Sequence, residues 1–207
     1  MSKVEEKKLE KYRKLLDAAY ELAEHKELVS ISIDEIVGRA GVAKGTFYLY
    51  FKDKYDLISK IILDRVCKFM NEERLKKHSL PPSAPIKEHI ELLVGEVMKF
   101  LKSNMTLTKL IDKNVHTCVN AVIENRNGDF AEIYELIGDG LRNLGFTAEE
   151  VNAKLYLLFD MIVSSCCNAL IRKNPLSPDR VCSQLTDIIT CFYTGASLYK
   201  KSTEVAI

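Results

Sequence analysis

The chain has 207 residues and carries 30 Lys and Arg against 29 Asp and Glu, so its formal net charge is +1. Hydrophobic residues make up 47% of the chain and charged residues 29%, a balance that is ordinary for globular proteins and excludes a disordered chain. The near-neutral charge also excludes a uniformly basic protein that coats nucleic acid, so any nucleic-acid function must lie in a local patch.

Apolar residues recur at intervals of three and four along almost the whole chain, which predicts helices. The stripes cover residues 9–23, 57–70, 86–101 and 130–144, and two long helices are expected at about 148–173 and 178–199. Proline clusters in residues 80–85 and 174–178 mark the clearest breaks. Strand alternation and repeats are absent from the sequence pattern, so the expected fold is all-α.

The ends and the cysteines point to an intracellular setting. Apolar runs stay well below the roughly 18 residues of a membrane span, and the charged N-terminus lacks the apolar segment of a secretory signal. We therefore expect a cytoplasmic protein with reduced thiols and no membrane partner. The adjacent Cys166 and Cys167 are interpreted as small buried residues, with a redox sensor as the alternative.

The segment 32–54 carries the strongest local signals. Ser32 and Glu35 fit a capping box, which starts a short helix that Gly41 ends. A second short helix is expected from Gly45 to Phe51. Two short helices joined by a glycine turn are typical of a helix-turn-helix. The basic excess is also local, because residues 39–60 contain five Lys or Arg and two Asp.

The second of these helices has two unlike faces. Phe47 and Phe51 share the inward face at 100° per residue, whereas Thr46, Tyr48, Leu49 and Lys52 point outward and Tyr50 lies at the margin. Hydroxyls and lysines reach phosphates, and an apolar group meets a thymine methyl, so this face suits the major groove of DNA. The alternative is that Tyr48 and Tyr50 are half-buried packing residues and that Lys54 is a solvated charge.

The run from Ser32 to Leu57 (SIDEIVGRAGVAKGTFYLYFKDKYDL) resembles the DNA-binding region of the TetR (tetracycline repressor) family of bacterial transcriptional regulators. The detailed resemblance covers roughly residues 10–60. It implies a helix-turn-helix DNA-binding domain at 1–55 and a helical ligand-binding and dimerisation domain at 56–207. Two positions depart from the common pattern: Val37 replaces a usual Ala, and Ala43 replaces a Ser that often caps the recognition helix.

The resemblance also implies contact residues and partners. The expected DNA contacts are Ser32, Lys44, Gly45, Thr46, Tyr48, Leu49, Tyr50 and Lys54. Of these, Lys44, Thr46 and Leu49 are assigned to base edges, and Tyr48, Tyr50, Ser32 and Lys54 to phosphates. The implied protein is a homodimer through the helices at about 148–173 and 178–199. It is a repressor that binds a near-palindromic double-stranded DNA operator and is released by a small-molecule effector. The alternative that the protein activates transcription is left open.

Polar or soft side chains within apolar stretches are the candidate effector contacts: His89, Met98, His116, Asn120, Tyr156 and Asp160. Asp160 is the strongest of these candidates, because a carboxylate among apolar residues must be paired, neutral or facing water. It could meet a cationic ligand, pair across the dimer or lie at an exposed edge. His116 and Cys118 are two residues apart and face different ways on a helix, so neither a metal site nor a cofactor is expected.

Two other classes of function, an enzyme and an interaction module, can be compared with the sequence. An enzyme would need a catalytic motif, and H-E-x-x-H, G-x-S-x-G, P-loop and Rossmann glycine patterns are absent, so we expect no catalytic residues. A helical interaction module that kept the fold without DNA binding would lack the basic and hydroxyl residues of 44–54, and these are present.

Overall fold

A computed structural model describes residues 2–70, 80–81, 83–124, 129–172 and 176–204, and these contain helices and no strand. The expected all-α class is confirmed. The chain divides into two compact units, Met1–Arg65 and Val66–Ile207. The division falls inside one helix, at Arg65, whereas the boundary predicted at residue 55 lies in the first turn of the same helix.

The first unit is built from three helices, a short 3₁₀ turn and the beginning of a fourth helix. They are α1 (Lys3–His25), η1 (Leu28–Ser30), α2 (Ile33–Ala40), α3 (Lys44–Tyr50) and α4 (Lys54–Met70). Helix α1 packs against both α2 and α3, and α2 packs against α3. Their shared core contains the fully buried side chains Leu15, Ala19, Ile31, Ile36, Phe47, Phe51 and Leu57. Burial of these apolar surfaces supplies most of the stability of such short helices.

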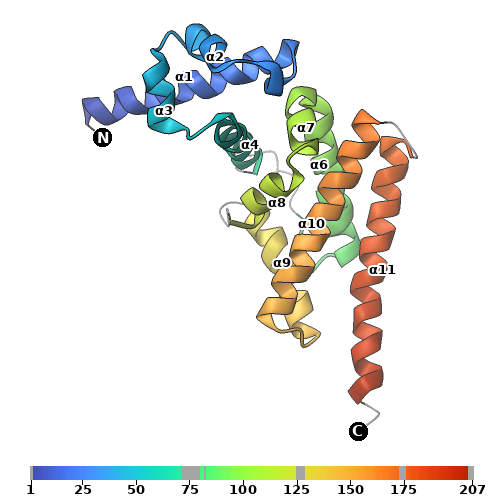
Figure 1. Cartoon of the computed structure of the whole chain (residues 1–207). Helices are drawn as coiled ribbons and strands as arrows, with labels where there is room; N and C mark the ends of the chain where they lie inside the picture. Colours follow the sequence, from blue (N-terminus) through green and yellow to red (C-terminus); the bar gives the residue numbers. More distant parts are fainter. Residues whose placement is uncertain (1, 71–79, 82, 125–128, 173–175, 205–207) are drawn as a thin grey trace. The chain divides into compact units, whose positions relative to one another are not determined.

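The second unit is a helical bundle centred on α10 (Figure 1). Its elements are the end of α4, α6 (Ile86–Ser103), α7 (Met105–Asp112), α8 (Val115–Glu124), α9 (Asp129–Asn143), α10 (Ala148–Ile171) and α11 (Pro178–Glu204). Helix α6 begins directly after Pro85, and the predicted long helices match α10 and α11. Residue 173, Pro82 and Pro175 lie outside the described residues.

Helix α10 is long and apolar enough to cross a membrane, judged by length and composition alone. Half of its most apolar window is buried inside the protein, and α10 contacts α6, α7, α8, α9 and α11. A helix that is apolar on most sides and enclosed by five others is a core helix. Its start is fixed by a capping box, in which the Thr147 hydroxyl accepts from the Glu150 amide at 3.3 Å.

Candidate DNA-binding surface

The predicted start and end of α2 are confirmed. The Ser32 hydroxyl accepts from the Glu35 amide at 3.2 Å, and the Glu35 carboxylate accepts from the Ser32 amide at 2.8 Å. The helix ends at Gly41, whose φ of 66° lies in the left-handed region that glycine adopts at little cost. The Val42 amide then donates to the Val37 carbonyl at 3.1 Å, which closes the turn. This turn sets the direction in which α3 leaves α2.

Ser32 is already engaged within the protein. Hydrogen bonds from Lys26, followed by those from the amide and hydroxyl of Ser32, lower the pKa of Glu35 to about 2. The Ser32 hydroxyl donates to Glu35 Oε2 at 2.9 Å. A DNA contact by this hydroxyl therefore competes with the cap of α2.

Aromatic packing anchors the inward face of α3. Phe47 and Phe51 are buried, and their ring centroids lie 5.3 Å apart. The Phe51 ring also stacks on Tyr12 of α1 at 5.4 Å. The N-cap residue Ala43 makes no side-chain cap bond, as its lack of a hydroxyl requires. Helix α3, with seven residues, is therefore held by its buried phenylalanines rather than by a side-chain cap.

The outward face of α3 has the predicted composition. Leu49 is 80% exposed and Tyr48 is 55% exposed, so neither contributes much to the core. This excludes the interpretation of Tyr48 as a half-buried packing residue. Thr46 and Tyr50 are half-buried, and the Tyr50 ring meets the edge of Tyr12 at a centroid distance of 5.9 Å. An exposed leucine beside a tyrosine and a lysine is an unusual solvent face but a suitable DNA-reading face.

Gly45 stands in the first turn of α3 without a steric reason in the protein. Among the described residues, no atom outside its own chain neighbours lies within 4 Å of the position that a Cβ would occupy. Glycine in a helix costs about 0.5–1 kcal/mol relative to alanine. Contacts within the described part of the protein therefore do not explain this glycine.

The predicted lysine contacts have partners within the first unit. Lys44 Nζ lies 2.9 Å from the carboxylate of Asp34, and this hydrogen bond raises the pKa of Lys44. Lys54 is half-buried and donates to the Ile31 carbonyl at 2.9 Å, so it is not a solvated charge. Asp34 was not among the predicted site residues, because its distance from Lys44 depends on the geometry of the turn.

The start of α4 is capped by two aspartates. Asp53 Oδ1 accepts from the Asp56 amide at 2.9 Å, and Asp56 Oδ2 accepts from the Lys52 amide at 3.0 Å. Asp53 and Asp56 thus fix the backbone between α3 and α4, the segment that carries Lys52 and Lys54.

In the second unit, apolar side chains of α4, α6, α7, α8 and α10 enclose a cavity of about 40 Å³. Those that line it include Phe69, Val97, Phe100, Cys118, Phe159 and Ile162. Phe69 and Phe100 stack at one wall, with ring centroids 4.0 Å apart. All of the described residues that line this cavity are apolar, so a charged group buried there would find no polar partner among them.

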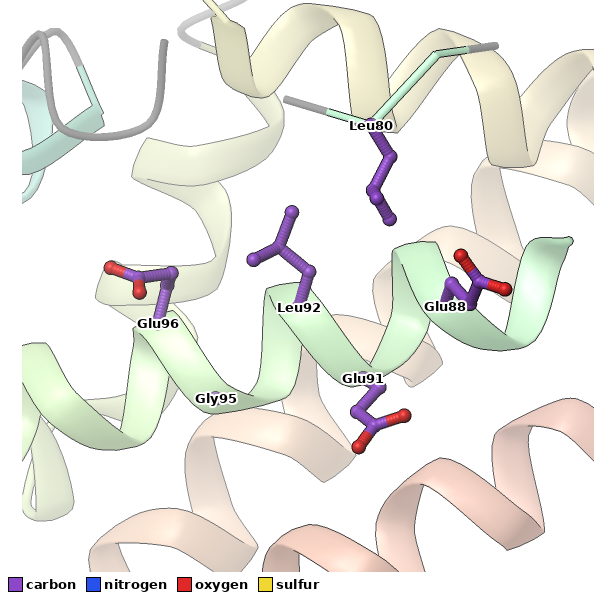
Figure 2. Close-up of a pocket in the computed structure, with 6 residues that line it drawn as sticks. All are labelled: Leu80, Glu88, Glu91, Leu92, Gly95 and Glu96. Atoms are coloured by element: carbon purple, nitrogen blue, oxygen red, sulfur yellow. The ribbon is translucent and has the colours of Figure 1, made fainter. Parts of the chain in front are cut away.

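A second, shallower pocket of about 340 Å³ lies along α6. Figure 2 shows Leu80 and Leu92 pointing into the same space, with Glu88 and Glu96 at either side. Glu96 also pairs with Lys99 at 3.3 Å. The rim of this pocket is acidic, which disfavours anionic ligands.

The six candidate effector residues do not gather at either of these two cavities in the described part of the chain. His89 and Met98 are buried. His116 and Asn120 are exposed, and Tyr156 and Asp160 are half-buried. Their role as effector contacts stays a prediction. The residues that line the enclosed cavity are apolar, so a prediction based on polar side chains does not include them.

The paired cysteines are buried, as the first interpretation predicted. Cys166 and Cys167 are fully buried and Cys118 is 4% exposed. Burial raises the pKa of all three thiols to about 12. The reactive thiolate form is therefore strongly disfavoured at these positions.

Comparison with known proteins identifies the DNA-binding unit. Residues 15–61 match the family described as "Bacterial regulatory proteins, tetR family". The chain is 26% identical over 145 residues to the fatty acid metabolism regulator protein of Bacillus subtilis (strain 168), covering 70% of this chain and 73% of that protein. It is 53% identical over 51 residues to the HTH-type transcriptional regulator YvdT of the same organism, covering 25% of this chain and 26% of that protein.

The fold of the whole chain has counterparts among solved structures. The transcriptional regulator FadR from Bacillus subtilis, in complex with stearoyl-CoA, superposes with a TM-score of 0.54 at 19% identity. The superposition covers 86% of this chain and 97% of that one. The family match in the first unit and the shared fold together support a DNA-binding transcriptional regulator. The similarity to the TetR family model lies within the first unit, at residues 15–61.

Proposed function

We propose that this regulator is a repressor that binds a near-palindromic operator as a homodimer and is released by an effector with a long hydrocarbon chain. The observation that carries the DNA-binding part is the exposed face of α3, where Tyr48 and Leu49 stand in solvent above buried Phe47 and Phe51. Thr46, Lys44 and Gly45 belong to the same contact surface, and Ser32, Tyr50 and Lys54 flank it. Such a regulator acts in the cytoplasm, where its operator lies.

The dimer is supported by an apolar patch on the two last helices. Leu157 of α10 is 66% exposed, and Ile188 and Phe192 of α11 are 53% and 51% exposed. Large exposed apolar residues on neighbouring helices are typical of an interface. A twofold dimer presents two α3 helices to two half-sites, which is why a near-palindromic operator is expected.

The effector class is supported by the enclosed cavity and by two relatives. The cavity is lined by apolar side chains. One relative is named a fatty acid metabolism regulator, and one structural neighbour holds stearoyl-CoA. At about 40 Å³ the cavity is far smaller than ordinary ligand pockets, which have roughly 300–1,000 Å³. A long acyl chain must therefore bind an expanded form of the bundle, and preference for that form shifts the equilibrium away from DNA.

The test is release of operator DNA, selected from a random pool, by stearoyl-CoA and by acetyl-CoA in a gel-shift titration. We expect stearoyl-CoA to release the DNA and acetyl-CoA to fail, because the two share a headgroup and differ in hydrocarbon. Release by both, or by neither, would contradict the acyl-chain assignment.

Val97→Phe should weaken release by stearoyl-CoA while operator affinity stays within about twofold. The larger ring fills the cavity, and overpacking costs about 1–3 kcal/mol, so the stearoyl-CoA concentration needed for release should rise about tenfold. Val115→Phe is the matched control, because Val115 is half-buried but does not line this cavity. Equal loss of response in both variants would show that the cavity is not the effector site.

A further inference from the structure

An exposed ion pair joins the first turns of the two helices of the helix-turn-helix. Lys44 Nζ lies 2.9 Å from Asp34 Oδ1, and the two side chains are 54% and 69% exposed. Asp34 is the second residue of α2, and Lys44 is the first residue of α3. Lys44 also precedes Tyr48 by four residues, so both stand on the outward face of α3.

The ion pair between Asp34 and Lys44 contributes little to the stability of the fold. Exposed ion pairs add little stability, because water screens both charges and two long side chains lose freedom. The start of α2 is already capped by Ser32 and Glu35, and α3 is held by the buried rings of Phe47 and Phe51. The consequence of the pair is electrostatic, since a carboxylate is held beside a lysine of the surface proposed to meet DNA.

We infer that Asp34 is a positioning residue that restrains Lys44 and lowers the affinity of this surface for DNA of any sequence. The inference rests on the proposed DNA contact of α3. Sequence-independent attraction comes from cations that replace the counterions of phosphates. A phosphate competes with Asp34 for the Lys44 ammonium, and the carboxylate of Asp34 also repels the DNA backbone. In the operator complex Lys44 is assigned to a base edge and not to a phosphate, so the loss of affinity caused by Asp34 should be greater for random sequence.

Asp34→Asn tests this, because it removes the charge and keeps the shape of the side chain. Affinity for the selected operator and for a random duplex is measured by fluorescence anisotropy across a salt series. We expect random-duplex affinity to rise about threefold, within the coupling range of exposed pairs. For the random duplex, the slope of log K against log salt should steepen by about one, because Lys44 then neutralises one further phosphate. Operator affinity should rise less.

Glu135→Gln is the control for net charge. Glu135 pairs with Arg142 on α9 at 2.8 Å, in the second unit, and the substitution changes the net charge by the same amount. Its salt slope should equal that of the unmodified protein. The second control is Lys44→Ala, in which Asp34→Asn should raise affinity less than in the unmodified protein, because only the repulsion between Asp34 and the DNA backbone is then removed.

Three results would overturn the inference. They are unchanged random-duplex affinity in Asp34→Asn, an equal rise in affinity in Glu135→Gln, or an equal rise in the Lys44→Ala background. If the unmodified protein binds its operator with a steep salt dependence, these results overturn the role of Asp34 but not the proposed DNA contact of α3. If the unmodified protein binds no duplex at all, the proposed function fails and this inference fails with it.

Discussion

Phe47→Ala should abolish operator binding and lower the free energy of unfolding of the first unit by about 3–5 kcal/mol, the range for removing a buried phenylalanine ring. Phe47 is fully buried, and its ring lies against both Phe51 and Tyr48. Helix α3 has no side-chain cap bond at its start, so these contacts carry its position. Urea unfolding followed by circular dichroism, with anisotropy on operator DNA, measures both effects.

Leu49→Ala is the matched comparison on the same helix. Because Leu49 is 80% exposed, its truncation should change the free energy of unfolding by no more than about 0.5 kcal/mol. We expect a changed base preference instead, if Leu49 meets a thymine methyl. Similar loss of stability in both variants would contradict the assignment of inward and outward faces.

Charging the apolar patch of α10 and α11 should separate the dimer. In Ile188→Glu combined with Phe192→Glu, two carboxylates replace side chains that are 53% and 51% exposed in the single chain. Burying them in an interface costs several kcal/mol, so the variant should be monomeric. Operator affinity should fall about 100-fold or more, because one α3 helix then reads one half-site. Sedimentation velocity and anisotropy measure the two quantities.

The control for this double variant is Ser183→Glu, an exposed position of α11 five residues before Ile188. At 100° per residue it faces a different direction, so it should stay dimeric and bind DNA normally. A double variant that remains dimeric would place the interface elsewhere, and a monomer with full operator affinity would show that dimerisation is not needed for binding.

Local signals explain why the helix-turn-helix could be predicted closely. The cap at Ser32, the left-handed Gly41 and the spacing of Phe47 and Phe51 each act over a few residues, and all have the predicted outcome. The helices α1, α4, α6, α9, α10 and α11 could likewise be predicted, because apolar residues recur at intervals of three and four over several turns of each.

The helices α7 and α8 were not predicted individually, because their stability comes from the bundle. The N-cap residue of α7, Asn104, makes no side-chain cap bond. Thr108 is instead fully buried and donates to the Leu101 carbonyl at 2.6 Å, a contact set by how α7 folds back on α6. Short helices held by such tertiary contacts leave a weak signal in sequence.

The two sites differ in how far they can be predicted from sequence. On the DNA-binding surface the outward residues follow from helical phase, but the partners of Lys44 and Lys54 depend on where the turns bring Asp34 and Ile31. In the second unit, residues such as Val97, Phe100 and Ile162 line a cavity. Their apolar stripes are indistinguishable in sequence from stripes that fill a core, so the cavity becomes visible only once the helices are packed.

Photo-crosslinking from the exposed face of α3 is the most direct test of the central claim. A benzophenone amino acid is placed at Leu49, which is 80% exposed, and in a second protein at Leu157 of α10, which is 66% exposed. On irradiation of the operator complex, position 49 should crosslink to the DNA strand and position 157 should not. Binding of the operator without any crosslink from position 49 would contradict the account.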